Sequence, residues 1–170
     1  PRVKIEISCL SMDEPTELRQ IRSLIGESFD GEDRGAESLV RTVVPTRTFL
    51  EKLFLLAEEF QKEKPRSVRM SRHLYDLEKL MDTEYGLEAL SNRKLYDAIV
   101  EHRKTYYALK YVNYDLHAPS SISFTIPKSV MDAWQDDYAD MRRFFIYGES
   151  LEFDALMQKM RELQERVRVM

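Results

Sequence analysis

The chain has 170 residues, of which 33% are charged and 43% hydrophobic, and it contains 5 glycines and 6 prolines. This composition excludes a collagen-like chain and argues against wholesale disorder. The formal net charge of −4 argues against a globally basic nucleic-acid-binding protein but leaves room for a local basic patch.

The apolar runs and the cysteine content limit the class of protein further. The longest unbroken apolar run, Leu53 to Ala57, is far too short to span a bilayer, so no membrane association is expected. Cys9 is the only cysteine, which rules out an internal disulfide. Together with the lack of a secretory signal segment, this predicts a cytoplasmic location.

The first 45 residues are expected to contain strands. Alternation of β-branched and polar residues over residues 3–7 predicts a strand with one buried face. The 3/4 spacing of apolar residues predicts a helix over Glu14–Phe29. A loop is expected at Gly31–Gly35 and a weaker strand at Ser38–Val44, ended by Pro45.

After Pro45 the apolar spacing becomes helical. The first expected helix has the stripe Phe49, Leu53, Leu56 and Phe60, and a polar connector (Gln61–Met70) separates it from a helix capped by Ser71 and stopped by Gly86. A long helix (Arg93–Tyr114), a loop (His117–Ser121) and an extended segment (Ile122–Ile126) are expected next. The chain is expected to end with a helix through Trp134, broken by Gly148, and a last helix from Phe153 to Val167.

These elements predict an α+β chain that is mainly α. The expected division is a β-containing start (residues 1–45) and a helical domain (residues 46–170). Because a two-stranded sheet is marginal by itself, the N-terminal strands are expected to pair either with residues 122–126 or with strands upstream of Pro1.

A lysine lies at the edge of the first helical stripe. Lys52 is about 100° around the helix from the stripe centred on Phe49 and Leu53. Its stem therefore has a partly apolar environment and its ammonium points to a rim. Periodicity alone favours a snorkelling side chain or a solvent-exposed ion pair over a functional group.

A second polar cluster follows Ser71. Arg72, His73 and Asp76 fall on one flank of the next helix, because residues three and four apart are neighbours. One interpretation is an Arg72–Asp76 surface pair in which His73 takes no part. The other is a carboxylate that Arg72 holds beside a polar cleft.

Three further patterns have two interpretations each. Between Gln61 and His73, five basic residues oppose only Glu63, which suits either phosphate groups or a solvated loop. The aromatic and basic residues from His102 to Tyr111 suit base stacking, but helical spacing favours tyrosines in the core. An acidic helix face at Asp132, Asp136 and Asp140 is expected to be solvated rather than a cation site.

The lysine and aspartate clusters resemble motifs of a known family. One motif is the segment from Pro45 to Lys52, Pro-Thr-Arg-Thr-Phe-Leu-Glu-Lys. The other is Ser-Arg-His-Leu-Tyr-Asp-Leu, whose aspartate, Asp76, lies 24 residues after Lys52. This pattern is similar to the nucleotidyltransferase toxins of the AbiEii/AbiGii type. The likeness continues through Trp134–Met141 and the terminal helix from Phe153, and so covers nearly the whole chain.

The resemblance implies a DNA polymerase β-like nucleotidyltransferase fold and a toxin of a two-gene toxin–antitoxin or abortive infection system. It implies transfer of a nucleotide from an NTP, with Mg²⁺, to an acceptor such as tRNA, and a cognate antitoxin as partner. On this resemblance Lys52 and Asp76 are the expected catalytic residues. The residues expected to bind the nucleotide phosphates are Lys52, Arg47, Arg69 and Arg72, and Glu6 is a candidate metal ligand.

One family motif is missing from the sequence. The family palm carries a Gly-Ser turn and an Asp-x-Asp pair, and neither occurs in these 170 residues. We therefore expect this chain to be the C-terminal part of a nucleotidyltransferase, with a palm remnant at residues 1–45. The isolated chain is expected to be inactive. The alternative is a non-catalytic helical module that binds an antitoxin or structured RNA.

Overall fold

The computed structural model describes Ile5, residues 16–29 and residues 37–170. The chain divides into two compact units, Pro1–Val44 and Pro45–Met170. The expected strand at residues 3–7, apart from Ile5, and the expected loop at residues 31–35 lie outside the described residues, as does Glu6.

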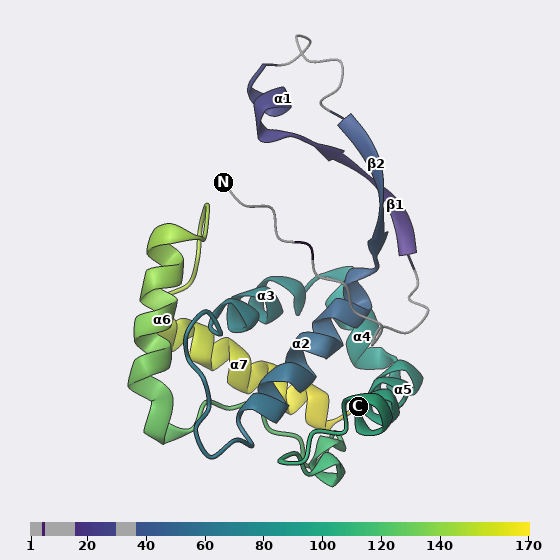
Figure 1. Ribbon diagram of the computed structural model, residues 1–170, viewed down its shortest axis with the longest axis vertical. Coiled ribbons are helices and arrows are strands. Elements are labelled where there is room, and N and C mark those ends of the chain that lie inside the picture. Colours follow the sequence, from purple (N-terminus) through teal and green to yellow (C-terminus); the bar gives the residue numbers. More distant parts are fainter. Residues whose placement is uncertain (1–4, 6–15, 30–36) are drawn as a thin grey trace. The chain divides into compact units, whose positions relative to one another are not determined.

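The described part of the first unit is a two-stranded antiparallel sheet with a short helix (Figure 1). Strand β1 (Thr16–Arg22) pairs with β2 (Glu37–Val43), in a register that places Thr16 opposite Val43 and Arg22 opposite Glu37. Helix α1 (Leu24–Ser28) begins after Ser23, whose hydroxyl accepts a hydrogen bond from the Gly26 amide. The sheet confirms the strand expected at Ser38–Val44.

The expected helix over Glu14–Phe29 is wrong, because residues 16–22 form β1 and only residues 24–28 are helical. The apolar side chains that suggested a helical stripe are all exposed, including Leu18 at 62% and Leu24 at 81%. Without a surface to cover that stripe, a helix gains little from its periodicity. Pairing with β2 satisfies the backbone of both strands instead.

The second unit is helical. Its elements are α2 (Pro45–Glu59), α3 (Arg72–Leu80), α4 (Glu84–Ser91), α5 (Arg93–His102), a π-helical turn η1 (Arg103–Tyr107), two short 3-10 helices η2 (Tyr114–His117) and η3 (Lys128–Val130), α6 (Met131–Phe144) and α7 (Phe153–Arg168). Together with the small sheet, they confirm an α+β chain that is mainly α.

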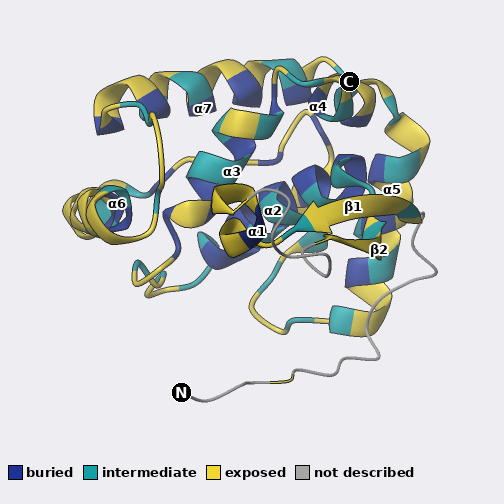
Figure 2. Cartoon of the chain, turned by 90° about the horizontal axis from the view of Figure 1, so that it is seen from above, coloured by how far each residue is buried: buried dark blue, intermediate teal, exposed yellow. Residues whose placement is uncertain are grey.

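Helix α2 lies at the centre of this unit and contacts α3, α4 and α5, while α7 contacts α3 and α6. The stripe predicted from the sequence is widened by Leu50 and Phe54, and both side chains are fully buried. Figure 2 shows the buried positions of α7 on the side that faces the other helices. Each such side chain contributes about 1.5–3 kcal/mol through removal of apolar surface from water. No helix in the described part of the chain combines the length and apolar character needed to cross a membrane.

Two expected helix ends differ in the structure. Gly86 does not stop a helix but lies inside α4, where a Cβ atom would meet the Leu80 carbonyl oxygen at 2.2 Å. The long helix expected over residues 93–114 leaves α-helical geometry at Arg103 and reverses at Ala108, whose φ of 43° is left-handed. Tyr106 and Tyr111 are 64% and 44% exposed, so the expectation of core tyrosines there is wrong.

The extended segment at residues 122–126 is present but is not part of the described sheet. Ile122, Phe124 and Ile126 are buried in the core. The Gln164 side chain of α7 accepts a hydrogen bond from the Phe124 amide and donates one to the Ile122 carbonyl. The segment is therefore held by a side chain of α7 instead of by a neighbouring strand.

Candidate active site

The structure brings Lys52 and Asp76 together. Lys52 projects from α2 and Asp76 from α3, and Lys52 Nζ lies 2.6 Å from Asp76 Oδ2. The two side chains are 23% and 35% exposed, so the ion pair lies at a rim that solutes can reach. The alternative Arg72–Asp76 pair is not formed, and among the described residues Arg72 makes no ion pair.

His73 lies directly beside this pair. It is 8% exposed, and its Nδ1 atom is buried without a hydrogen-bond partner among the described residues. Burial, followed by the positive charges of Lys52 and Arg72, lowers the pKa of His73 to about 4, against the opposing effect of Asp76. The imidazole is therefore neutral at pH 7. The sequence placed His73 beside Arg72 and Asp76 but did not indicate that its ring is buried and neutral.

We expect the His73 ring to titrate near pH 4 in the folded protein and near pH 6.5 in the protein unfolded in urea. Because only the unfolded state then binds this proton between those values, the free energy of unfolding should fall as the pH is lowered through that interval. NMR titration of the ring resonances measures the first effect. Comparison of wild type with His73→Asn across the same interval isolates the second. A ring that titrates near pH 6.5 in the folded state would contradict the buried placement.

Asp137 of α6 holds the turn that leads into α3. Its Oδ1 accepts a hydrogen bond from the Arg69 amide at 2.5 Å, and its Oδ2 accepts bonds from the Ser71 amide at 3.0 Å and the Ser71 hydroxyl at 2.5 Å. Arg69 has a φ of 58°, a left-handed conformation that costs free energy in a non-glycine residue. Ser71 occupies the predicted N-terminal position of α3, but its hydroxyl bonds to Asp137 instead of capping the helix. Asp137 thereby positions the helix that carries Asp76.

Replacement of Asp137 by alanine is expected to destabilise the protein by about 2 kcal/mol, because two backbone amides and a buried hydroxyl lose their acceptor. The matched control is Asp136→Ala, which removes an exposed carboxylate from the neighbouring position and should change stability by less than about 0.5 kcal/mol. Urea unfolding measures both. Equal stabilities of the two variants would show that Asp137 does not hold the turn.

The opposite flank of α2 carries a buried ion-pair network. The Arg103 guanidinium donates to both carboxylate oxygens of Glu58, at 2.7 and 2.5 Å, and also to Glu51. Arg47, which is 5% exposed, donates to Glu51 at 3.0 Å. The buried His117 lies 3.8 Å from Glu58, and burial is the main reason that its pKa is lowered. Arg47 is thus held in this network, and Lys52 lies on another side of the same helix.

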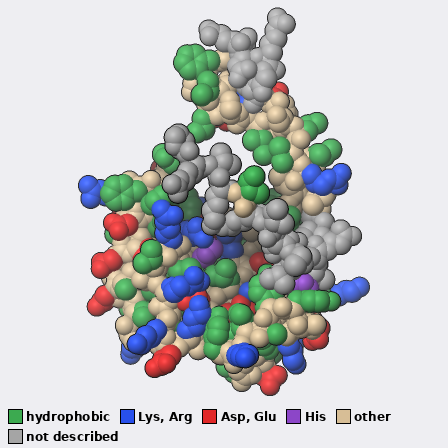
Figure 3. Space-filling model, viewed as in Figure 1, with side chains coloured by type: hydrophobic (Ala, Val, Ile, Leu, Met, Phe, Trp, Pro, Cys, Tyr) green, Lys and Arg blue, Asp and Glu red, His purple; other side chains and the backbone are tan. Residues whose placement is uncertain are grey.

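The basic segment between α2 and α3 is partly neutralised. Glu59 accepts hydrogen bonds from Lys62 and from the backbone and side chain of Arg66. Burial alone would raise the pKa of Glu59, but these hydrogen bonds outweigh burial and lower it. The guanidinium carbon of Arg69 lies 5.3 Å from the centre of the Phe145 ring. The side chain of Arg72 is exposed. Figure 3 shows lysine and arginine side chains gathered around a histidine on one face of the helical unit.

No metal site is formed by the described residues, in which no three His, Cys, Asp or Glu side chains lie close enough to share an ion. Asp132, Asp136 and Asp140 are exposed on α6, as expected for a solvated face. The described residues therefore do not fit the Mg²⁺ site that nucleotidyl transfer generally uses.

Comparison with known proteins identifies a family. A family model described as "Nucleotidyl transferase AbiEii toxin, Type IV TA system" matches residues 1–159. No curated protein matches the chain. No solved structure matches it either. The matched range includes Lys52, His73, Asp76 and Asp137.

Proposed function

The chain belongs to the AbiEii family of nucleotidyl transferase toxins of type IV toxin–antitoxin systems, and from this membership we propose that Lys52 and Asp76 act in transfer of a nucleotide from an NTP to an acceptor. The observation that carries the proposal is the 2.6 Å contact between Lys52 Nζ and Asp76 Oδ2, which joins two helices at a partly open rim. Such a transfer needs a cation that binds the NTP phosphates and a base that accepts the proton of the acceptor hydroxyl. The ammonium and the carboxylate at this rim are suited to these two tasks.

We assign the binding of the triphosphate to Lys52. An ammonium on a flexible stem acts as a point charge that can contact phosphate oxygens. Asp76 holds this ammonium at the rim when no nucleotide is bound. The neutral His73 beside it adds no further positive charge at pH 7.

The second assignment concerns the proton of the acceptor. When the NTP phosphates bind the ammonium of Lys52, Asp76 is free to orient the acceptor hydroxyl and to accept its proton. The acceptor oxygen then forms a bond to the α-phosphorus, the bond to the bridging oxygen of the β-phosphate breaks, and pyrophosphate leaves with that electron pair. A second role for Asp76, which needs no proton transfer, is to fix Lys52 alone.

Of the arginines expected to bind phosphate, Arg72 fits the proposal best. It is exposed, and its charge acts on His73, next to Asp76. Arg69 is tied by its backbone to Asp137, and its guanidinium packs over the Phe145 ring, so we assign this exposed side chain only to an outer phosphate. Arg47 is not included, because it is buried against Glu51.

Several parts of the proposal come from the family and not from the site. They are an RNA acceptor such as tRNA, action in the cytoplasm, and a cognate antitoxin, and of these the family description supports the antitoxin. We also propose that these 170 residues do not transfer nucleotides by themselves, because they contain no Asp-x-Asp pair. No catalytic step is assigned to Mg²⁺ or to Glu6.

The proposal is tested by incubation of the full-length protein with each of the four α-³²P-labelled NTPs and total RNA. Label in the RNA is the expected result, and the 170-residue chain assayed alongside should give none. Label in protein would replace the RNA acceptor by a protein. No transfer to either, from any of the four NTPs, would overturn the enzymatic assignment in favour of a binding module.

A further inference from the structure

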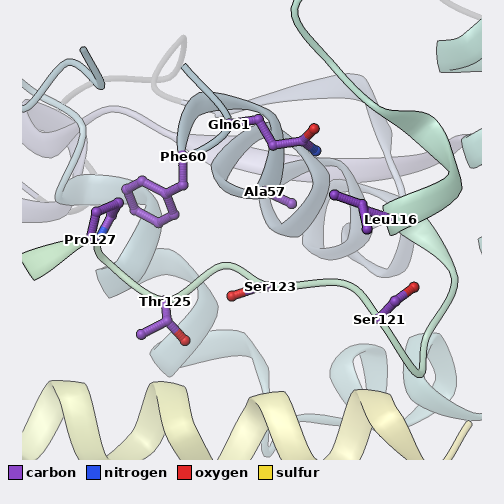
Figure 4. A pocket seen from close by; sticks show the side chains of 8 residues that line it. All are labelled: Ala57, Phe60, Gln61, Leu116, Ser121, Ser123, Thr125 and Pro127. Atoms are coloured by element: carbon purple, nitrogen blue, oxygen red, sulfur yellow. The ribbon is translucent and has the colours of Figure 1, made fainter. Parts of the chain in front are cut away.

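A pocket of about 240 Å³ with a mixed polar and apolar lining lies at the end of α2 (Figure 4). Phe60 and Gln61, just after α2, form one side of it together with Leu116, and the extended segment supplies Ser121, Ser123 and Thr125 on the other side. Ala57 of α2 also lines the pocket and lies five positions after Lys52, about 140° around the helix. The pocket therefore opens on a different side of α2 from the Lys52–Asp76 pair.

The hydroxyl groups in the pocket follow from the alternation of the extended segment. Ile122, Phe124 and Ile126 point into the core, so the intervening Ser121, Ser123 and Thr125 point the other way. Gln164 uses the Phe124 amide and the Ile122 carbonyl. Among the described residues, neither the backbone nor the hydroxyl of Ser123 and Thr125 has a hydrogen-bond partner. Donors and acceptors are thus free along one wall.

The lining of the pocket determines what it can hold. No charged side chain lines it, and the Phe60 ring, which packs on Trp134 at 4.9 Å, forms part of an apolar wall. An uncharged planar ring with hydrogen-bonding edges suits such a mixture of an aromatic face and hydroxyl groups. The volume is below the roughly 300–1,000 Å³ of sites for drug-sized ligands, which favours a group as small as one base.

We propose that this pocket binds an unpaired nucleobase of the acceptor RNA. The inference rests on the proposed function for the presence of RNA. The basic segment supports it, because this segment starts at Gln61 in the pocket wall and ends at Arg72 beside Asp76. Lys62 is paired with Glu59, whereas Lys64, three positions after Gln61, is exposed and makes no ion pair within the described residues. Lys64 therefore offers a positive charge within three positions of the pocket wall for the phosphates of a bound base.

The test uses the full-length protein and a fluorescein-labelled single-stranded RNA 12-mer of mixed sequence, followed by fluorescence anisotropy. Ser123→Phe fills the pocket from an exposed position, and Ser91→Phe adds the same ring at an exposed position on α4 that does not line it. We expect Ser123→Phe to raise the Kd for the RNA at least about fivefold, the loss of one stacked base, and Ser91→Phe to leave it unchanged. The double variant Ser123→Ala/Thr125→Val, which adds no bulk, should raise the Kd in the same direction.

The outcomes separate this inference from the proposed function. In the transfer assay, Ser123→Phe should raise the KM for the RNA acceptor and leave the KM for the NTP unchanged. If Ser123→Phe, the double variant and Ser91→Phe bind the RNA equally, the base-binding pocket is wrong, whatever the transfer activity. If Ser123→Phe instead weakens binding of the cognate antitoxin and leaves the RNA Kd unchanged, the pocket is a protein-docking site and the inference is also overturned. Absence of transfer with an intact effect on RNA binding would overturn the proposed function alone.

Discussion

Replacement of Lys52 by alanine is expected to lower the rate of nucleotide transfer by the full-length protein by about 100-fold or more, the usual loss when one charged group that stabilises a reacting phosphate is removed. The same change should shift the free energy of unfolding by less than about 1 kcal/mol, because the Lys52–Asp76 pair is 23% and 35% exposed and such pairs are screened by water. A large loss of activity with little loss of stability is therefore the expected signature of Lys52.

The control is Lys94→Ala on α5, since Lys94 is exposed and makes no ion pair among the described residues. It should keep the wild-type rate within about twofold. Lys52→Arg retains the positive charge with a different shape and should recover part of the rate, because a point-charge contact tolerates the exchange better than a bidentate one. A Lys52→Ala protein that transfers nucleotides within threefold of the wild-type rate would refute the assignment of the triphosphate to this residue.

The largest effect on stability is expected at Arg103. Its guanidinium is 5% exposed and binds Glu58, which is also 5% exposed. Removal of one partner from a buried pair leaves the other charge without compensation, at a cost of about 3–5 kcal/mol. For a protein of this size, Arg103→Met should lower the Tm by about 10 °C or more.

Arg93→Met is the matched control for this change. Arg93 also pairs with an acid, Asp97, but the two side chains are 52% and 56% exposed, and the cost should be below about 0.5 kcal/mol. The double variant Arg103→Met/Glu58→Leu removes both buried charges and should recover much of the lost stability. Thermal unfolding followed by circular dichroism measures all three proteins. A Tm for Arg103→Met that equals that of Arg93→Met would show that the network does not stabilise the fold.

Local periodicity in the sequence was sufficient for the main helices. The stripe from Phe49 to Phe60 predicted α2, and similar stripes predicted α6 and α7, because a helix that buries one face repeats its apolar residues every three to four positions. The weaker strand expected at Ser38–Val44 corresponds to β2. For the three helices, the pattern of burial follows from the spacing of neighbouring apolar residues, whereas the side chains of β2 are nearly all exposed.

The same reasoning failed where distant contacts compete with local pattern. Residues 16–22 have apolar spacing that suits a helix, yet they pair with β2 and leave those side chains exposed. Gly86 looks like a helix stop, yet it is required inside α4, where the Leu80 carbonyl approaches too closely for a side chain. The first case depends on pairing with a strand that lies elsewhere in the sequence, and the second on the backbone conformation six positions earlier, which apolar periodicity does not report.

The candidate site, too, was only partly predictable from the sequence. The family resemblance indicated Lys52 and Asp76 and their separation of 24 positions, whereas the 2.6 Å contact between them depends on how α3 packs beside α2. The neutral state of His73, the Asp137 hydrogen bonds that hold the start of α3, and the burial of Arg103 with Glu58 also arise only in the folded chain. Burial and charge neighbours are properties of the packed helices, because they depend on residues far apart in sequence, whereas helix and strand preference depends on residues that are adjacent in it.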